Sequence, residues 1–468
     1  MEKKSLTHYN MYIDKALIKK YNQAGPRYTS YPPANHFSES FNVKDYLGLL
    51  EASNHQKPQS ISLYIHIPFC PQICYFCGCN THLMGSRKQV RRYIDALKQE
   101  IHIVAARLDR SRPLTQVHWG GGTPNSLPLH YIGEVMDEIR DLFTLAENPE
   151  IAMECSPAYL ELKDVVALAR MGFNRMSLGI QDMNAELLKK LHRRPQKYPP
   201  EDLYRMARKS GFEGVNFDFV YGLPGQTLED HLASIRRAVE ISPERIVTFS
   251  YAHVPWFKEH QKKLEVYHLP DANEKLTMLE SAFKLITQNG YIPIGMDHYA
   301  KPDDELARAL NNKTLHRNFQ GYTTREKTGQ VYAFGATGIS QLSGGYSQNT
   351  RSLEQYMDSL ERGELPVFRG YRLSEEEKVR RRVLNEIMCN HYLDFDAVAR
   401  DFKLDGERVK ELVEFDPARL REFARDGLVE YSAQKVEVTS RGFFLIRNIA
   451  MQFDPLMSKP TKGYSKTI

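Results

Sequence analysis

Strand-like and helix-like segments alternate from about residue 58 to residue 300, and this alternation limits the possible folds more than any other feature of the chain. Patterns of buried strands occupy residues 61–69, 114–119, 150–154, 176–180, 214–221 and 245–252. Amphipathic helical patterns separate them. Such alternation predicts a parallel sheet with helices outside it. Six repeats fall short of the eight that close a complete barrel, so we expect an α/β fold with a partial (β/α)6 barrel. A further strand pattern occurs at 292–296.

The segments on either side of this region have different patterns. Residues 1–57 are polar and irregular, and they contain a stretch at 25–33 rich in turn residues and tyrosines. We expect residues 1–57 to form an N-terminal arm. The arm either packs on the surface through its aromatic side chains or covers the mouth of an active site.

The part of the chain after the alternating region is expected to hold two more units. Residues 301–371, with polar loop-like stretches at 301–305 and 316–322, should extend the barrel and link it to the C-terminal unit. Residues 372–468 have a mostly helical pattern, with a hairpin pattern after residue 427, which predicts a winged-helix-like C-terminal domain. No dense Lys/Arg recognition helix is present there, so we expect a packing or lid domain.

Four cysteines lie within ten positions, directly after the first strand pattern: Cys70, Cys74, Cys77 and Cys79. The first three have the spacing C-x3-C-x2-C. Iron–sulfur clusters are normally held by four thiolates, so three thiolates on one loop would leave one iron free for another ligand. A structural zinc site is the alternative, but such sites typically use two separated ligand pairs. Because Cys155 and Cys389 are solitary, the spacing favours an iron–sulfur cluster.

Composition narrows the class of protein further. The net charge of +5 is small for 468 residues, so a dedicated nucleic-acid binder is not indicated. Clustered cysteines in a large chain are typical of a metal site in a reducing compartment. The N-terminus continues into polar residues without an apolar core, and no apolar run approaches about 20 residues. We therefore expect a cytoplasmic protein without a membrane span.

Glycine and acidic residues come directly after several of the strand patterns, at the edge where parallel α/β sheets bind ligands. The triplet Gly120–Gly122 would let the backbone approach a ligand closely, and its free amides could meet an amino-acid group. Tyr75 and Phe76, inside the cysteine loop, could cover an adenine. S-adenosylmethionine has adjacent amino and carboxylate groups that could chelate the open iron, and it carries an adenine. Each feature alone has an ordinary structural explanation, so their shared location is what indicates a site.

The cysteine loop together with Gly120-Gly-Gly-Thr-Pro124 resembles the radical S-adenosylmethionine enzymes. The fourth cysteine makes the chain similar to one branch, the oxygen-independent coproporphyrinogen III oxidase family. Matching stretches cover nearly the whole chain and lie at residues 21–32, 64–70, 118–124, 179–182, 218–224, 251–253, 295–298, 316–323 and 445–449.

The resemblance implies one [4Fe–4S] cluster and two S-adenosylmethionine molecules on a partial (β/α)6 barrel. The implied cluster ligands are Cys70, Cys74 and Cys77, with Cys79 in the motif but not a ligand. By matching position, the first S-adenosylmethionine site would be lined by Tyr64, Phe76, Gly121, Gly122, Thr123, Glu154, Arg193, Asp218 and Val220. The second would be lined by Gly121, Gln181, Ala252 and Ile339.

The implied reaction is the decarboxylation of two propionates of coproporphyrinogen III to vinyls through 5′-deoxyadenosyl radicals, giving protoporphyrinogen IX for haem biosynthesis. The resemblance identifies no catalytic side chain for the substrate radical. The substrate carries four propionates, and arginine offers bidentate geometry to carboxylates. We expect Arg27 or Arg317 to pair with propionates; the alternative is a solvated surface charge. The cations expected near the barrel mouth are Arg27, Lys301, Arg317 and Arg325.

The same resemblance implies partners and leaves rival functions. We expect a flavodoxin- or ferredoxin-like electron donor, a monomer, and no nucleic acid. Two rivals share the barrel: a haem-binding chaperone and a haem-degrading radical methyltransferase. The chaperones generally lack Cys79 and the Arg27–Tyr31 arm, both of which are present here. A third rival is a DNA-binding iron–sulfur sensor that would use the winged-helix-like region.

Overall fold

The computed structural model describes residues 14–458 and residue 464, and it is built around one large sheet. The centre of this sheet consists of six neighbouring parallel strands. They are β1 (Ile61–Ile67), β4 (Leu114–Gly121), β5 (Leu145–Cys155), β6 (Arg175–Gln181), β7 (Gly214–Tyr221) and β8 (Arg245–Ser250). The partial (β/α)6 barrel predicted from the alternation is confirmed.

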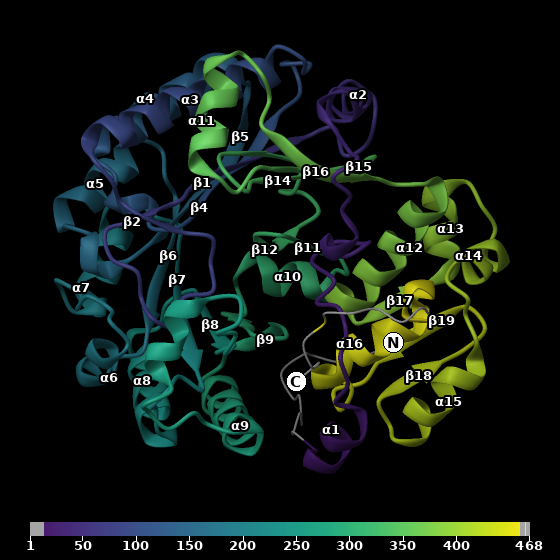
Figure 1. Cartoon of the computed structure of the whole chain (residues 1–468). Coiled ribbons are helices and arrows are strands. Elements are labelled where there is room, and N and C mark those ends of the chain that lie inside the picture. Colours follow the sequence, from purple (N-terminus) through teal and green to yellow (C-terminus); the bar gives the residue numbers. More distant parts are fainter. Residues whose placement is uncertain (1–13, 459–463, 465–468) are drawn as a thin grey trace.

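Helices come after each of these strands and cover the outer face of the sheet (Figure 1). They are α3 (Arg87–Ala105), α4 (Leu129–Leu142), α5 (Leu162–Arg170), α6 (Ala185–Lys190), α7 (Pro200–Lys209), α8 (Leu228–Ile241) and α9 (Ala272–Gln288). Their apolar positions recur at helical spacing. In α3, Tyr93, Leu97 and Ile101 are fully buried against the strands, within the main core cluster.

The sheet continues beyond the six strands on both sides. After β8, the chain adds β10 (His298–Ala300) and β9 (Ile292–Gly295), both antiparallel to their neighbours. The strand expected at 292–296 therefore exists, but it closes the edge of the sheet and does not begin a seventh repeat. Beside β1 lies the parallel strand β13 (Gln330–Phe334). Beyond it are the antiparallel strands β14 (Ile339–Leu342), β15 (Gly345–Asn349) and β16 (Val367–Arg372), with α11 (Leu353–Glu361) against α3.

Two stretches expected to be irregular, 316–322 and the N-terminal region, contain regular structure, so those expectations are wrong. Residues 301–304 are irregular as expected and are followed by α10 (Glu305–Asn311), but residues 315–324 form the hairpin β11 (Leu315–Asn318) and β12 (Gly321–Thr324). The N-terminal region contains α1 (Lys15–Tyr21) and α2 (Val43–Ser53), while residues 1–13 lie outside the described part. In α2, Asn42 and Asp45 form a capping box. Its buried face is Tyr46, Leu49, Leu50 and Ser53, a helical spacing.

The C-terminal domain is mostly helical, as predicted. It contains α12 (Glu375–Asn385), α13 (Phe395–Phe402), α14 (Gly406–Leu412), α15 (Pro417–Arg425) and α16 (Ile446–Ala450). A small antiparallel sheet has the order β17 (Tyr392–Asp394), β19 (Lys435–Val438), β18 (Val429–Tyr431). Short 3₁₀ helices occur at η1 (Ala34–His36), η2 (Pro124–Ser126), η3 (Pro157–Tyr159), η4 (Glu259–Leu264), η6 (Phe443–Leu445), η7 (Met451–Phe453) and η8 (Pro455–Ser458), and η5 (Glu386–Asn390) is a π-helical segment.

The N-terminal arm runs between the barrel and the C-terminal helices (Figure 1). Tyr28 is buried, and its hydroxyl donates to Asp454 Oδ2 at 2.9 Å. The buried Tyr31 accepts, through its carbonyl, a hydrogen bond of 3.1 Å from the Tyr346 hydroxyl in β15. Arg447 in α16 donates to the carbonyls of Gly25 and Pro26. The tyrosines of the arm therefore act as packing residues that join β15 to the C-terminal domain.

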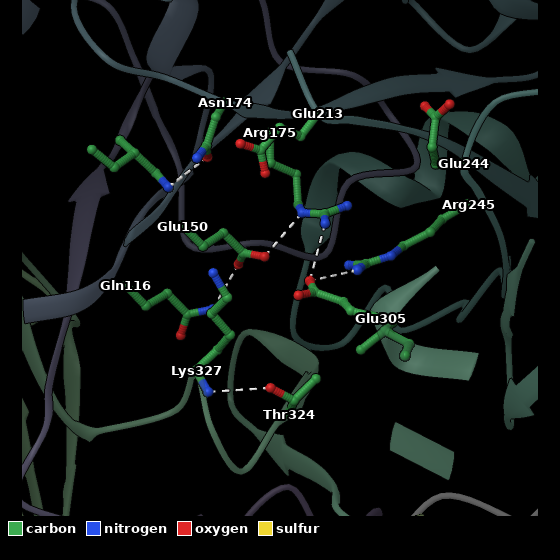
Figure 2. A network of polar contacts seen from close by, with 12 residues as sticks. Gln116, Glu150, Asn174, Arg175, Glu213, Glu244, Arg245, Glu305, Thr324 and Lys327 are labelled. Atoms are coloured by element: carbon green, nitrogen blue, oxygen red, sulfur yellow. Dashed lines mark hydrogen bonds and ion pairs between the residues drawn. The ribbon is translucent and has the colours of Figure 1, made fainter. Parts of the chain in front are cut away.

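A network of charged side chains fills the barrel at the amino ends of its strands (Figure 2). Arg175 Nε donates to Glu150 Oε2 at 2.9 Å and Arg175 Nη2 donates to Glu305 Oε1 at 3.0 Å. Arg245 Nη2 donates to the same Glu305 oxygen at 2.9 Å, and Arg245 Nε donates to Asp304 Oδ2 at 2.9 Å. Buried charges of this kind are tolerated because each has a partner. Because this network fills the amino end, the open end of the barrel is the one at the carboxyl ends of the strands.

Candidate functional site

The cysteine loop lies across the carboxyl end of the barrel. It begins in β2 (Phe69–Cys70), directly after β1, and returns through β3 (His82–Leu83), parallel to β2. Neighbouring loops hold its backbone: the Tyr75 amide donates to the Leu191 carbonyl at 3.0 Å. The Tyr75 ring stacks on His192 with centroids 4.5 Å apart. The loop is thereby fixed against the segment that comes after β6.

The three predicted cluster ligands lie on this loop in different electrostatic environments. Thr123 Oγ1 donates to Cys70 Sγ at 3.3 Å, and Arg193 Nη1 donates to Cys74 Sγ at 3.6 Å. Burial raises the pKa of Cys70 to about 11 and also raises the pKa of Cys74. A hydrogen bond from Cys79 lowers the pKa of Cys77 to about 6. The predicted non-ligand Cys79 therefore favours the thiolate of Cys77, the form that binds metal.

Three thiols on one loop are compatible with an iron–sulfur cluster that has one iron open to another ligand. Each cysteine of a cubane cluster binds a different iron, so the thiols need not converge on one point. Among the described residues, no three His, Cys, Asp or Glu side chains are placed to hold one metal ion. The Arg193 guanidinium beside Cys74 favours thiolates.

At the end of β4, the amides of Gly121, Gly122 and Thr123 are bonded within the protein and are not free, which corrects the expectation from the sequence. The Gly121 amide donates to Glu154 Oε2 at 3.1 Å, and the Gly122 amide donates to the Ile67 carbonyl at 2.7 Å. The Thr123 amide donates to the Phe69 carbonyl at 2.9 Å. A Cβ atom at Gly122 would lie 2.7 Å from the Phe69 oxygen. Glycine is needed because two backbone segments touch, and the turn carries Thr123 to Cys70.

Polar side chains from neighbouring strands face one another inside the barrel next to this turn. The rings of Tyr64 and His118 stack with centroids 5.9 Å apart. His118 Nε2 lies 3.1 Å from Glu154 Oε1. On the next strands, Ser177 Oγ donates to Asp218 Oδ2. The structure thus brings the predicted residues Tyr64, Gly121, Glu154 and Asp218 around one space, on β1, β4, β5 and β7, with Ser177 on the intervening strand β6.

The pKa values of the two carboxylates in this space, Glu154 and Asp218, are shifted in opposite directions. Burial raises the pKa of Glu154, but the hydrogen bond and charge of His118 and the Gly121 amide outweigh it, so the pKa lies below its usual range. Burial lowers the pKa of His118, but Glu154 outweighs it and raises that pKa. Burial raises the pKa of Asp218 to about 6 against the opposing effect of Ser177. His118 and Ser177 are further site residues. His118 lies within the matching stretch 118–124, whereas Ser177 was not singled out, although its alternation with buried residues in β6 was visible in the sequence.

Among the remaining residues predicted to line S-adenosylmethionine, Ile339 lies in a different apolar cluster from Phe76 and Val220. Phe76 packs against an apolar cluster that contains Val220 and Tyr251. Arg193 Nη2 donates to the Gly179 carbonyl, and Gln181, at the end of the same strand, has a φ of 71°. The Ala252 carbonyl accepts from Gln261 Nε2 at 3.3 Å. Ile339 belongs to a different apolar cluster, packed against Phe37, Tyr346 and Leu373.

Three arginines gather beside Asp297 where the arm meets the barrel. Arg317 is buried, and its Nη1 donates to the Arg27 carbonyl at 2.7 Å. The charges of Arg317 and Arg27 both contribute, after His298, to the lowered pKa of Asp297. Arg447 lies in the same group, since burial and then the charges of Arg27 and Arg317 lower its pKa to about 10. Arg447 was not singled out from the sequence, although it lies within the matching stretch 445–449.

The other two cations expected at the mouth lie elsewhere, so their expected position is wrong. Lys301 Nζ donates to the Ser242 carbonyl at 2.7 Å, near the amino end of β8. Arg325 forms an ion pair with Glu386 of the C-terminal domain. Arg317 also lines a cavity of about 370 Å³ between the arm and α12, with Tyr28, Tyr31, Arg381 and Arg382.

Comparisons with known proteins place this site in a class and then in a family. The radical SAM superfamily model matches residues 64–238, and the HemN C-terminal domain model matches residues 373–445. The fold and the cysteine loop therefore define a radical SAM enzyme, and membership of that superfamily implies a [4Fe–4S] cluster and S-adenosylmethionine.

Full-length relatives identify the family. Oxygen-independent coproporphyrinogen III oxidase from Synechocystis is 40% identical over 95% of this chain and 96% of its own. The Salmonella typhimurium protein of the same name is 40% identical over 96% of each chain. The structure described as coproporphyrinogen III oxidase (HemN) from Escherichia coli has a TM-score of 0.87 and 38% identity, covering 95% of this chain and 99% of that chain. The chain belongs to the oxygen-independent coproporphyrinogen III oxidase family.

Proposed function

We propose that this enzyme converts coproporphyrinogen III to protoporphyrinogen IX without oxygen, by oxidative decarboxylation of two propionates to vinyls in haem biosynthesis. The observation that carries the proposal is the cysteine loop fixed over the polar carboxyl end of a six-stranded barrel. Relatives of that name match this chain along its length at about 40% identity.

The proposed cofactors are one [4Fe–4S] cluster and two S-adenosylmethionine molecules. Cys70, Cys74 and Cys77 hold the cluster, and the Arg193 guanidinium balances the thiolate charge at Cys74. When bound, the cluster supplies one electron that splits S-adenosylmethionine into methionine and a 5′-deoxyadenosyl radical. The first molecule is lined by Tyr64, Phe76, Gly121, Gly122, Thr123, Glu154, Arg193, Asp218 and Val220. The second is lined by Gly121, Gln181, Ala252 and Ile339.

The carboxylates of the first site bind the polar groups of that ligand in our proposal. Glu154, held ionised by His118, accepts hydrogen bonds from the amino group of the methionine moiety. Asp218 lies two strands away and accepts from the ribose hydroxyls. The apolar cluster around Phe76 and Val220 excludes water from the reacting end, which protects a radical from side reactions.

The arginine group at the arm binds the propionates of the substrate. Arg27, Arg317 and Arg447 lie close enough for their charges to interact, and the charge of Asp297 acts on all three. Such a group of positive charges attracts ionised carboxylates, and arginine binds them in a bidentate fashion. The arm and the C-terminal domain close this side of the barrel. The domain boundaries near residues 57, 300 and 371 therefore separate the arm, the barrel, its extension and the C-terminal domain.

The proposal also covers the cellular location, the oligomeric state and the partners of the protein. No helix in the described part of the chain combines the length and apolar character needed to cross a bilayer. We propose a cytoplasmic monomer that uses a flavodoxin- or ferredoxin-like donor and does not bind nucleic acid.

One anaerobic experiment tests this function against its rivals. The purified protein is analysed for iron and sulfide and is then incubated with coproporphyrinogen III, S-adenosylmethionine and dithionite. Vinyl products support the proposal. A methylated open tetrapyrrole would support the haem-degrading methyltransferase, and tight haem binding without turnover would support the chaperone. A colourless protein containing zinc would refute the cluster, and salt-sensitive DNA binding would support the sensor.

The substrate site is tested by Arg27→Ala and Arg317→Ala. Each variant is expected to weaken coproporphyrinogen binding at least tenfold, because one bidentate contact to a carboxylate is lost. Exposed Arg236 provides a control at Arg236→Ala. Unchanged substrate affinity in both variants would refute the role of the arginine group.

A further inference from the structure

The most exposed large apolar side chains of the described chain lie next to the cysteine loop in sequence or in the loop after β8. Trp256 is 82% exposed, Val266 81% and Phe257 62%, all after β8, and Leu83 of β3 is 63% exposed. Every other exposed large apolar side chain in the described part is at most 38% exposed. Leu83 is the register partner of Cys70. Exposed aromatic groups concentrated in one place indicate an interaction surface.

The loop after β8 is bonded directly to the backbone of the cysteine loop. Lys258 Nζ donates to the Cys79 carbonyl at 2.7 Å. His260 Nε2 lies 2.9 Å from the Cys77 carbonyl, and Gln261 Nε2 donates to the Phe76 carbonyl at 3.1 Å. Two residues, Lys258 and Glu259, therefore separate the exposed aromatic pair Trp256–Phe257 from His260, whose ring reaches the carbonyl of the predicted cluster ligand Cys77.

The charge around these apolar groups is positive on balance: from Trp256 to Val266, the loop after β8 carries Lys258, Lys262 and Lys263 against Glu259 and Glu265, and Glu259 lies 3.4 Å from Lys262. Residues 70–86, which contain the cysteine loop, include no Asp, Glu, Lys or Arg. The adjoining segment 186–197 contains five Lys or Arg residues and one Glu. Lys190 Nζ lies 5.9 Å from the centre of the Tyr267 ring, which joins this segment to the loop after β8. Lys263 Nζ lies 4.6 Å from the centre of the Tyr75 ring.

We propose that this surface docks a small acidic one-electron carrier protein. We call it the donor face and define it by its exposed side chains Leu83, Lys189, Trp256, Phe257, Lys262 and Val266. The inference rests on the proposed function, which requires electrons one at a time at the cysteine loop. At each docking the carrier loses one electron and the cluster of this chain gains one.

Two arguments favour an acidic redox protein: the positive charge of the donor face and the position of that face next to the cysteine loop. Electron transfer weakens steeply with distance, so a carrier must approach the cysteine loop, and the donor face is bonded to it. Lysines around an apolar centre steer an acidic partner and speed its association. A few exposed aromatic anchors suit the small, short-lived interfaces of redox encounters.

Binding is tested with the full-length, cluster-loaded enzyme and with oxidised flavodoxin and ferredoxin as probes. Trp256→Ala/Phe257→Ala is expected to weaken carrier binding at least tenfold in calorimetry. Lys189→Glu/Lys262→Glu is expected to slow association and to reduce its dependence on salt. Matched controls outside the donor face are Phe368→Ala/Leu404→Ala and Lys44→Glu/Lys403→Glu, which replace exposed residues of the same kinds. Carbodiimide cross-linking should join Lys189 or Lys262 to carrier carboxylates.

A second measurement separates docking from the chemistry. Cleavage of S-adenosylmethionine driven by dithionite, a small reductant that needs no docking, should be unchanged in the donor-face variants. Cleavage driven by reduced flavodoxin should fall at least tenfold. If wild-type enzyme fails with dithionite, the proposed function fails and the carrier binding measurements still judge the donor face.

Three outcomes would overturn the proposal. The first is carrier binding unchanged by Trp256→Ala/Phe257→Ala. The second is cross-links that map to other surfaces or to a second copy of this chain. The third is a raised KM for coproporphyrinogen III in the dithionite assay, which would assign Trp256 and Phe257 to the substrate.

Discussion

The charged network at the barrel base (Figure 2) makes a strong prediction about stability: Arg245→Met should destabilise the folded chain by about 3 kcal/mol. The Arg245 side chain is 6% exposed and donates to Asp304, which is 4% exposed, and to Glu305. Removing one partner of a buried ion pair costs about 3–5 kcal/mol, because the other charge stays buried. Arg175 remains 3.0 Å from Glu305 and 4.0 Å from Asp304. Arg175 continues to balance both charges, so we expect a loss of stability near the lower end of the range of about 3–5 kcal/mol.

This free energy converts into a measurable shift of the melting temperature. The unfolding entropy is about 2.1 cal/mol/K per residue, or about 1 kcal/mol/K for a chain of this size. If the whole chain unfolds in one transition, the Tm is expected to fall by about 3 °C. If a barrel of roughly 240 residues unfolds alone, the shift is about 6 °C. Differential scanning calorimetry of the metal-free protein distinguishes the two cases.

Arg237→Met is the matched control, because Arg237 is 48% exposed and pairs with Glu201 and Glu240 at the surface. Exposed pairs contribute at most about 1 kcal/mol, so its Tm should fall by no more than about 2 °C. Adding Asp304→Asn to Arg245→Met should restore part of the loss. Asparagine still caps α10, where Asp304 Oδ1 accepts from the Leu306 amide. Equal shifts for Arg245→Met and Arg237→Met, or no recovery from Asp304→Asn, would refute this reasoning.

Three further predictions concern the cluster, the arm and acid stability. Cys77→Ala should lose the iron–sulfur absorption whereas Cys79→Ala should retain it, as judged by iron and sulfide per chain; equal iron in both would contradict the ligand assignment. Tyr28→Phe removes a buried hydrogen bond to Asp454, worth about 1–3 kcal/mol, and should speed proteolysis of the arm, unlike the control Tyr431→Phe, which removes an exposed hydrogen bond to the Pro417 carbonyl. Burial raises the pKa of Glu150, but Arg175 and Arg245 outweigh it and lower that pKa from 4.5 to about 2. Its stabilisation is therefore present above about pH 4.5 and is lost as the pH falls toward 2. The stability difference between wild type and Glu150→Gln in urea should shrink on acidification, and a constant difference would argue against the ion pairs.

The sequence was sufficient for the barrel because its six strands repeat one local pattern. Helical spacing and buried strand runs identify each unit without long-range information, and β7 at Gly214–Tyr221 begins and ends as expected. Short polar elements were missed for the converse reason. The hairpin β11–β12 is stabilised by contacts to distant residues, such as the Leu315 amide donating to Asn390 Oδ1 at 3.0 Å. No local pattern encodes such a contact.

Motif matching placed the cysteine loop correctly but could not show how its neighbours are bonded. The glycine turn was interpreted as a source of free amides, yet those of Gly121, Gly122 and Thr123 are bonded to Glu154, Ile67 and Phe69. Glycine in a turn is compatible with approach to a ligand or to another segment of the chain. Only the structure shows which applies. Arg447 was missed similarly, since its meeting with Arg27 and Arg317 depends on the position of the arm.

The two ends of the barrel show how one alternating pattern supports both stability and chemistry. Glu150 and Glu154 lie on the same face of β5, about 13 Å apart, because side chains alternate along a strand. At the amino end, Glu150 is paired with Arg175 through Nε at 2.9 Å, and its pKa is lowered to about 2. At the carboxyl end, Asp218 lacks an arginine partner among the described residues, and burial raises its pKa to about 6. Ion pairs at the base fix the strands in place. The incompletely balanced charges at the other end can therefore bind ligands without supporting the fold.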